Sequence, residues 1–422
     1  METVPKSMRL QIALFGRTNV GKSSFLNLVS GQEIAITSPV PGTTTDVVEK
    51  VMELLPIGPV VFLDTAGIDD TTELGKERIR KTRQVFRRAD IVVILCEADV
   101  WGDPEREIAA EGAERKVPVI AVVNKSDLRP PSEEFLKRLK EEEGLSAILS
   151  VSSLSGENGN RDRVLADFKR ALIENCPEDF IAPPPLVGDL LSPGDLAVLI
   201  VPIDLQAPKG RLILPQVQTI RDVLDGDASV LVVKEDQYLS MLRTLKTPPS
   251  LAVCDSQVVM KMVAETPPDI PCTTFSILFS RLKGDMTMMA RGTAAIAKLK
   301  DGDKVLIAEA CSHHATSDDI GRVKIPRWLR QYTSADLQID VYAGRDYPDK
   351  LSEYKLVIHC GGCMLNRREI LSRIQTAAKA GVPVTNYGMC ISFTQGVLER
   401  VLSPFPEALA AFREAAGKRE EK

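Results

Sequence analysis

The sequence lacks long apolar runs, an excess of basic residues and, almost entirely, histidine. Its longest apolar stretches, such as 196–201, fall far short of the roughly 20 residues that span a bilayer, and the first ten residues, METVPKSMRL, contain no apolar signal segment. The formal net charge of -5 disfavours a protein that mainly grips phosphate backbones, since that task needs a basic surface. These absences predict a cytoplasmic protein without membrane contact and speak against nucleic acid as a partner.

The composition is that of an ordinary globular protein, with 44% hydrophobic and 26% charged residues in a chain of 422. A prior of about 150 residues per domain suggests two or three domains. Proline-rich breaks at 183–185 and 266–268 interrupt the alternation of apolar runs and helical segments, because consecutive prolines neither continue a helix nor donate to a sheet. We therefore expect three α/β domains, at 1–180, 186–265 and 270–410.

The first domain shows short β-rich runs that alternate with charged segments of helical period. This pattern predicts a parallel sheet covered by helices on both faces. The middle domain repeats the alternation on a smaller scale. The third domain opens with a helical, methionine-rich segment over 275–300, and apolar strands at 305–308 and 356–358 precede its cysteines.

A phosphate-loop motif, GRTNVGKS at 16–23, follows the apolar strand 10–15 and opens a helical segment. Its glycines allow backbone N–H groups to close around phosphate oxygens. The Lys22 ammonium supplies a positive charge, and the Ser23 hydroxyl can hold Mg²⁺. The motif therefore predicts a nucleoside triphosphate site.

Two further motifs fit the phosphate end of such a site. Asp64 and Gly67, in DTAG, come directly after an apolar strand, which places a carboxylate near Mg²⁺ and a glycine amide near the γ-phosphate. Thr43 and Thr44, in PGTTTD, stand where the threonine of a switch loop closes over the phosphates.

The base is predicted to be guanine. In NKSD at 124–127, the Asp127 carboxylate can accept hydrogen bonds from the N1–H and 2-amino groups of guanine, which adenine does not offer together. Ser152 and Ser153, after the last strand, complete the base pocket. The residues expected to bind GTP or GDP are Gly16, Asn19, Gly21, Lys22, Ser23, Ser24, Thr43, Asp64, Asn124, Lys125, Asp127, Ser152 and Ser153. Those expected to act in hydrolysis are Lys22, Thr44, Asp64 and Gly67, with Ser23 and Thr44 on Mg²⁺.

This set of motifs resembles the translation-factor-related GTPases of the tRNA-modification and ribosome-assembly type. Several of those relatives carry an asparagine at the position of Asn19 that helps to coordinate K⁺, so the resemblance implies dependence on that cation. Ile68 replaces the glutamine with which small Ras-like GTPases orient the attacking water, which predicts slow hydrolysis. Thr45 stands where many relatives have arginine, so the details of that loop do not carry over.

All three histidines, His313, His314 and His359, lie beside cysteines of the third domain, in CSHH and HCGGC. Each element follows an apolar strand, and the ends of parallel strands meet at one edge of a sheet. Eight cysteines in a cytosolic chain do not suggest a disulfide framework. Three chemistries fit: a redox pair in the Cys-x-x-Cys turn, a tetrahedral zinc site, or a 4Fe-4S cluster on Cys311, Cys360 and Cys363. The spacing of the cysteines and histidines favours a zinc site and an iron-sulfur cluster equally, and both ahead of a redox pair.

The order of a phosphate-loop GTPase domain, a small α/β domain, and then Cys-x-His followed at a distance by His-Cys-x-x-Cys resembles the maturation GTPases of iron-only (FeFe) hydrogenases over nearly the whole chain. The resemblance implies an iron-sulfur domain at 270–410 with a 4Fe-4S cluster on Cys311, Cys360 and Cys363. It also implies a homodimer formed by the middle domain. Its implied partners are radical-SAM maturases, which make a two-iron precursor, and the apo-hydrogenase that receives it.

The fourth cluster ligand stays open. His313, His359 and Asp318 are candidates for that position or for hydrogen bonding to a cysteine sulfur, and an exchangeable ligand is expected. GTP hydrolysis is expected to act as a switch on domain arrangement or partner release. The alternatives are an RNA- or ribosome-associated GTPase with a zinc-binding third domain, and a thiol-redox regulator that uses Cys360 and Cys363.

Overall fold

The computed structural model describes residues 4–31, 47–69, 84–142, 144–153, 158–202, 212–310, 319–344, 346–348 and 350–417. The chain forms two compact units, Met1–Pro183 and Pro184–Lys422. Both are built from parallel sheets and helices, so the predicted α/β class is confirmed. The predicted division into 1–180, 186–265 and 270–410 stays a prediction, and the second unit contains two separate sheets.

The first unit contains a six-stranded sheet in the order β2-β3-β1-β4-β5-β6. Its strands are β1 (Leu10–Gly16), β2 (Val48–Leu54), β3 (Gly58–Asp64), β4 (Ile91–Glu97), β5 (Val119–Asn124) and β6 (Leu145–Ser150). The expectation of a wholly parallel sheet is wrong for β2, which runs antiparallel to β3. Only residues 55–57 join these two strands, and so short a connection permits only a hairpin.

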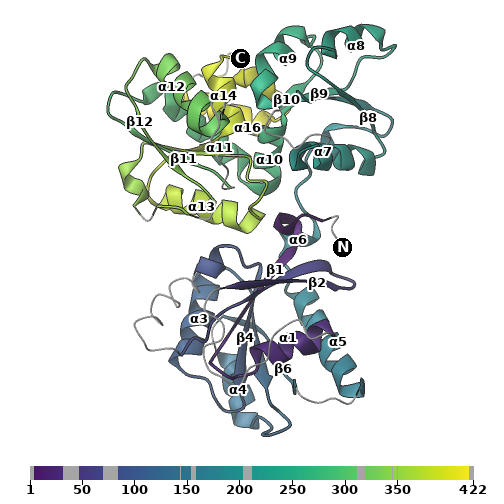
Figure 1. Ribbon diagram of the computed structural model, residues 1–422, viewed down its shortest axis with the longest axis vertical. Coiled ribbons are helices and arrows are strands. Elements are labelled where there is room, and N and C mark those ends of the chain that lie inside the picture. Colours follow the sequence, from purple (N-terminus) through teal and green to yellow (C-terminus); the bar gives the residue numbers. More distant parts are fainter. Residues whose placement is uncertain are drawn as a thin grey trace. The chain divides into compact units, whose positions relative to one another are not determined.

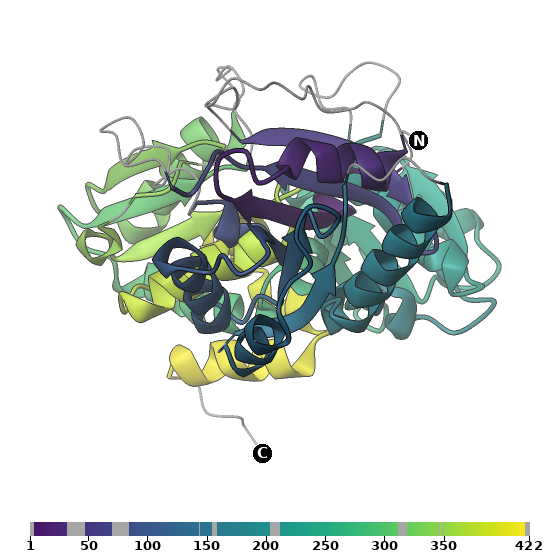
Figure 2. The same cartoon turned by 90° about the horizontal axis from the view of Figure 1, so that it is seen from below.

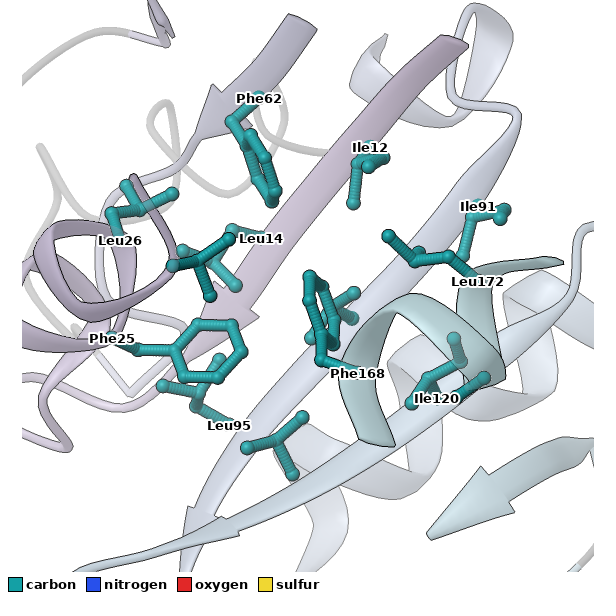
Figure 3. Close-up of a cluster of buried hydrophobic side chains, with 14 of the residues drawn as sticks. Ile12, Leu14, Phe25, Leu26, Phe62, Ile91, Leu95, Ile120, Phe168 and Leu172 are labelled. Carbon is teal, nitrogen blue, oxygen red and sulfur yellow. The ribbon is translucent and has the colours of Figure 1, made fainter. Parts of the chain in front are cut away.

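Helices cover both faces of this sheet (Figure 1, Figure 2). They are α1 (Lys22–Ser30), α3 (Asp103–Glu114), α4 (Glu133–Glu141) and α5 (Asn158–Glu174), and the short α6 (Glu178–Ile181) follows. The helices α1 and α5 contact each other and share one hydrophobic cluster with the strands. In this cluster Phe168 of α5 meets Phe25 of α1 edge-on, with ring centroids 5.1 Å apart (Figure 3). Residues of α3 and α4 pack on the opposite face.

The second unit begins with a four-stranded parallel sheet in the order β10-β9-β7-β8. Its strands are β7 (Leu196–Ile200), β8 (Ser229–Val233), β9 (Leu251–Cys254) and β10 (Cys272–Thr274). The intervening helices are α7 (Leu214–Asp225), α8 (Tyr238–Thr244) and α9 (Val259–Glu265). The alternation predicted for this region is confirmed, with β10 as an additional edge strand.

The other sheet of this unit is also parallel, in the order β12-β11-β13-β14. Its strands are β11 (Lys304–Ala308), β12 (Gln338–Tyr342), β13 (Leu356–His359) and β14 (Val384–Asn386). Its helices are α10 (Phe275–Lys283), α11 (Met286–Thr293), α12 (Ile325–Thr333), α13 (Arg367–Lys379), α14 (Tyr387–Thr394), α15 (Leu398–Leu402) and α16 (Pro406–Ala415).

The segment over 275–300, which was expected to be helical, is helical, but it forms more than one helix. The chain breaks between α10 and α11 at Gly284 and Asp285, and the Asp285 carboxylate caps α11 by accepting from the Met288 N–H at 2.8 Å. An aspartate at this position favours a new helix start over continuation of the previous helix.

Candidate functional site

The phosphate loop joins β1 to α1 in a conformation that exposes backbone N–H groups. Asn19 and Gly21 have positive φ angles of 61° and 98°. A Cβ on Gly21 would clash with the Asn124 amide nitrogen, so only glycine fits there. The Lys22 ammonium donates to the carbonyl oxygens of Gly16 at 2.8 Å and Arg17 at 3.0 Å, and burial lowers the pKa of Lys22 to about 8. The loop thus holds its cation where phosphate would bind.

Asp64 lies at the end of β3, beside β1, and is 3% exposed. Burial raises the pKa of Asp64, although the Lys50 ammonium, 3.4 Å from the carboxylate, and Lys22 act in the opposite direction. Gly67 lies against Thr18, and an added Cβ would clash with the Thr18 hydroxyl. A buried carboxylate next to the phosphate loop is the arrangement that a Mg²⁺ site needs.

Two other residues of the predicted phosphate site, Ser23 and Ser24, lie partly exposed in the first turn of α1. Thr43 and Thr44 lie outside the described residues, as does Thr45. The structure therefore describes the phosphate loop but not the predicted switch threonines.

The base-binding motifs converge on Asn124, which ends β5 and is 1% exposed. Its amide donates to the Val20 carbonyl of the phosphate loop at 2.9 Å. Its side-chain oxygen accepts from the N–H and the hydroxyl of Ser153, at 3.1 Å and 2.8 Å. The Ser152 hydroxyl in turn donates to the Asp127 carboxylate at 2.5 Å. One buried amide thus connects three motifs that lie far apart in the sequence.

Lys125, the remaining residue of this motif, has a φ of 57° and forms an ion pair with Glu97 at the end of β4. An aliphatic lysine stem at this position can pack against a flat base.

Sequence reasoning missed two contacts of the phosphate loop. The Asp69 carboxylate accepts from the Thr18 N–H at 2.8 Å and from its hydroxyl at 2.9 Å, so the segment after DTAG is tied to the loop. Arg17 forms a two-point ion pair with the fully buried Glu105, at 2.6 Å and 2.9 Å. Glu105 carries a helix-capping signal, because it also accepts from the Gly102 N–H, but nothing local links it to Arg17.

The HCGGC motif lies at the carboxyl edge of the sheet that contains β11 and β13. These strands are parallel neighbours, with Ala308 opposite His359. Two residues after β11, the Ala310 N–H donates to the Cys360 sulfur at 3.0 Å, and the Gly362 N–H donates to the same sulfur at 3.4 Å. The predicted ligands Cys311, His313 and Asp318 lie outside the described residues.

The donor set fits an iron-sulfur cluster. Cys360 and Cys363 are partly exposed on a turn in which Gly362 has a φ of 65°. N–H groups directed at a cysteine sulfur are the hydrogen bonds that stabilise cluster thiolates. Within the described ranges, no three His, Cys, Asp or Glu side chains group closely enough to hold a metal alone, so a site here needs a residue outside those ranges.

The other described cysteines differ from this pair. Cys254, Cys272 and Cys390 are buried, and burial raises the pKa of each. Burial likewise raises the pKa of Cys96 to about 12. A thiol of raised pKa in an apolar setting behaves as a core side chain.

His359 is enclosed by the protein, with 1% of its surface exposed. Its ring stacks on that of Tyr347, with centroids 5.9 Å apart. The Arg373 guanidinium lies over the Tyr347 ring, 5.1 Å from its centroid. Burial, with the charge of Arg373, lowers the pKa of His359 to about 3, so the imidazole is neutral. Its Nε2 atom has no hydrogen-bond partner among the residues that the structure describes.

No helix in the described part of the chain is both long and apolar enough to cross a bilayer.

Comparison with known proteins gives separate results for the two units. Residues 11–125 match the family model of the 50S ribosome-binding GTPase. The tRNA modification GTPase MnmE of Synechococcus sp. (strain JA-3-3Ab) is 46% identical over 125 residues, which are 29% of this chain and 26% of that protein. The chain thus spans about a quarter of that relative's length.

GTPase Era of Thermoanaerobacter sp. (strain X514) is 30% identical over 243 residues, covering 53% of this chain and 76% of Era. A solved structure of Era, in complex with MgGDPNP and nucleotides of 16S ribosomal RNA, is 22% identical with a TM-score of 0.35, covering 53% of this chain and 93% of that one. The match of residues 11–125 to the GTPase family model shows that the N-terminal unit contains a P-loop GTPase domain.

The second unit matches models of a different family. Residues 186–284 match the hydrogen maturase F dimerization domain, and residues 287–404 match the hydrogen maturase F tetramerization domain. Both are oligomerisation domains, and together they account for most of the second unit. With a GTPase domain preceding these two domains in one polypeptide, the chain belongs to the hydrogen maturase F (HydF) family of GTPases.

Proposed function

We propose that this protein is a GTP-hydrolysing scaffold in the maturation of FeFe hydrogenase. In this proposal it holds a 4Fe-4S cluster on Cys311, Cys360 and Cys363 and carries a two-iron precursor, its cargo, from radical-SAM maturases to the apo-hydrogenase. Such a cluster supplies a site with an exchangeable iron position. Family membership supports the maturation role.

One contact carries the cluster assignment. The Ala310 N–H donates to the Cys360 sulfur at 3.0 Å, and Ala310 is the residue directly before Cys311. The parallel pairing of β11 with β13 brings Ala310 and Cys360 together, although they are fifty residues apart in sequence. This contact supports the proposal, because three thiolates on one cluster require that both cysteine motifs meet.

The fourth ligand is proposed to be exchangeable, with His313, His359 and Asp318 as the residues of this chain that can occupy the position. His359 is neutral and its Nε2 is unpartnered among the described residues, both of which suit either ligation or a hydrogen bond to sulfur. A weak fourth ligand leaves one iron open to a bridging group from the cargo.

On the nucleotide side, we infer slow hydrolysis that K⁺ stimulates. Ile68 is 8% exposed, and its N–H donates to the Gly16 carbonyl at 3.3 Å, so an apolar side chain follows DTAG where Ras-like proteins orient water. Asn19 is held at a φ of 61° within the phosphate loop, in the position that coordinates K⁺ in related GTPases. The proposal further includes a cytoplasmic homodimer formed through the middle domain, and hydrolysis that alters domain arrangement or partner release.

Anaerobic purification followed by metal analysis and electron paramagnetic resonance tests the proposal. The wild-type chain should be brown and contain iron and sulfide, and its spectrum should be that of a 4Fe-4S cluster. Cys360→Ser and Cys363→Ser should lose most of the iron. Cys176→Ser, which changes a cysteine of the first unit, is the matched control and should retain it.

The rival function is an RNA- or ribosome-associated GTPase with a zinc-binding module, which the description of the matching GTPase model favours. A colourless protein with stoichiometric zinc, lost in the same serine variants, would replace the proposed function by this one. Iron in the wild type and its loss in both serine variants would exclude the rival.

A further inference from the structure

Lys283, the last residue of α10, lies against the Cys-Gly-Gly-Cys turn and is 2% exposed. Its ammonium donates to three backbone carbonyls of the turn, those of Gly362 at 3.1 Å, Cys363 at 3.2 Å and Leu365 at 2.8 Å. An ammonium group has three N–H bonds, so each of the three carbonyls can accept one of them. A buried cation thus organises the turn that carries both cysteines.

The contact is reciprocal. Arg367, the first residue of α13, donates to the carbonyls of Leu282 and Gly284, both at 3.0 Å. The end of α10 therefore binds the cysteine turn through Lys283, and the segment just after that turn binds the end of α10 through Arg367. Five hydrogen bonds from two cations fix the position of the turn relative to α10, whereas a single contact would let the turn rotate.

The helix that carries Lys283 is itself anchored outside the cysteine sheet. Arg281 forms a two-point ion pair with Asp189, with one distance of 2.6 Å, and donates to the Leu186 carbonyl at 3.3 Å. Lys283 also lies at the end of the region that matches the dimerization model, whereas the cysteines lie in the region that matches the tetramerization model. The cation therefore reaches the cysteine turn from a neighbouring domain of the family.

We infer that Lys283 is a positioning residue of the cluster site, which fixes the turn so that the Cys360 and Cys363 thiolates converge and whose positive charge favours the reduced cluster. This inference deepens the proposed function and rests on it. Lys283 holds its place through backbone carbonyls, so it acts on the cluster through the turn and through its charge, without ligating iron.

The direction of the charge effect follows from electrostatics. Reduction adds one electron to the cluster, and a nearby fixed cation stabilises the added negative charge, which raises the reduction potential. A unit charge within about 10 Å, at an effective dielectric constant of about 20, changes an equilibrium constant by roughly tenfold.

The test compares reconstituted wild-type protein with Lys283→Met, Lys283→Gln and Lys283→Arg. Dithionite supplies the electrons in a redox titration that is followed by electron paramagnetic resonance. At a fixed potential, Lys283→Met and Lys283→Gln should shift the ratio of oxidised to reduced cluster about tenfold toward the oxidised form, which corresponds to 59 mV for a one-electron couple. Lys283→Arg, which keeps the charge, should restore most of the potential.

Lys298→Met is the matched control, because it removes an exposed lysine of the same unit and should leave the potential unchanged. Hydrogen exchange of the cluster-free protein tests positioning separately: the peptide that contains 360–366 should exchange at least tenfold faster in Lys283→Met than in wild type. If Lys283→Met does not fold, Lys283→Gln carries both measurements, since its amide still donates to carbonyl groups.

The outcomes separate this inference from the proposed function. If the wild-type chain takes up no iron, the cluster assignment and this inference fall together. If the wild type binds its cluster but Lys283→Met and Lys283→Gln leave both the potential and the exchange rate unchanged, only the role of Lys283 is overturned. A change in exchange rate without any change in potential overturns the charge effect and leaves a purely structural lysine.

Discussion

Lys22 and Lys283 occupy similar settings in the two units. Lys283 is buried and Lys22 is half-buried. Each donates to backbone carbonyls of a glycine-containing loop at the end of a parallel strand, and desolvation of the ammonium lowers the pKa of each to about 8. They differ in where they come from. Lys22 lies five and six residues along the chain from the two residues whose carbonyls it binds. Lys283 lies 79 to 82 residues along the chain from the residues whose carbonyls it binds. A lysine that donates to loop carbonyls is therefore part of a recognisable sequence motif in the first unit, whereas in the second unit no sequence motif indicates it.

The largest expected effect is a loss of GTP turnover in the first unit with no change in the iron content of the second. Lys22→Ala should lower GTP turnover by roughly 1000-fold, because the lost ammonium stabilises charge on the transferring phosphoryl group. Iron content after reconstitution should stay at the wild-type level, since the cysteine turn lies in the other unit. Phosphate release and iron analysis on the same preparation measure both, with Lys137→Ala, an exposed lysine of α4, as control. Parallel loss of both activities would contradict separable sites.

Asp127→Asn should change which base the first unit accepts. The amide no longer offers two acceptors to the N1–H and 2-amino groups of guanine, so affinity for GTP should fall roughly 100-fold. Xanthosine triphosphate carries a carbonyl where guanine has its 2-amino group. The asparagine amide can donate to this carbonyl, so xanthosine triphosphate should bind better than GTP. Competition binding measures both nucleotides, and Asp162→Asn, an exposed carboxylate of α5, should bind GTP normally. An unchanged preference for GTP would remove Asp127 from the base pocket.

In the second unit, the two glycines between Cys360 and Cys363 provide a matched pair. Gly362→Ala should destabilise the unit by about 1–3 kcal/mol, because a φ of 65° strains alanine and its Cβ would lie 2.9 Å from the Ile370 Cδ1 atom. Iron uptake should fall with it. Gly361→Ala places its Cβ in open space and should affect neither quantity. Thermal melting and iron analysis decide, and equal behaviour of the two variants would show that the turn is not rigid.

The smallest effect concerns the anchor of α10. The hydrogen bonds and charge of Arg281 hold the pKa of Asp189 below its usual value, so the carboxylate contributes stability that is present above pH 3.8 and is lost as the pH falls through its folded pKa. Asp189→Asn should therefore melt slightly below wild type at pH 7, and this difference should shrink as the pH falls below 3.8. Thermal scans across this range measure the difference, with Asp336→Asn as a surface control. A difference that does not shrink as the pH falls would contradict an ionic anchor.

Much of the nucleotide site was predictable because its chemistry is local. GRTNVGKS, DTAG and NKSD each follow a strand whose apolar run is visible in the sequence. In the structure Asn124 contacts Ser153, and Asp127 contacts Ser152. The antiparallel β2 was missed because its residues alternate weakly and one face of the strand is mostly exposed. The break inside the helical segment over 275–300 was not foreseen, because Gly284 and Asp285 lie within an otherwise continuous apolar pattern.

The cysteine region was predictable in part. Ligands that follow neighbouring parallel strands were expected at one edge, and Ala310 does contact Cys360 there. The burial of His359 against Tyr347 and Arg373 could not be foreseen, because neither residue lies in a motif with the histidine. Local patterns report which element a residue belongs to, but they do not report which distant side chain packs on it.

The amino-acid sequence predicts which residues bind a guanine nucleotide and which ligate a metal, because both chemistries depend on residue types at fixed short spacings. The packing of the folded chain is what joins Asn124 of the base motif to the phosphate loop, and Lys283 and Arg367 to the contact between α10 and the cysteine turn. Those contacts join residues about 80 to 100 positions apart. Their geometry is set by how sheets and helices pack, and no local period in the chain encodes it.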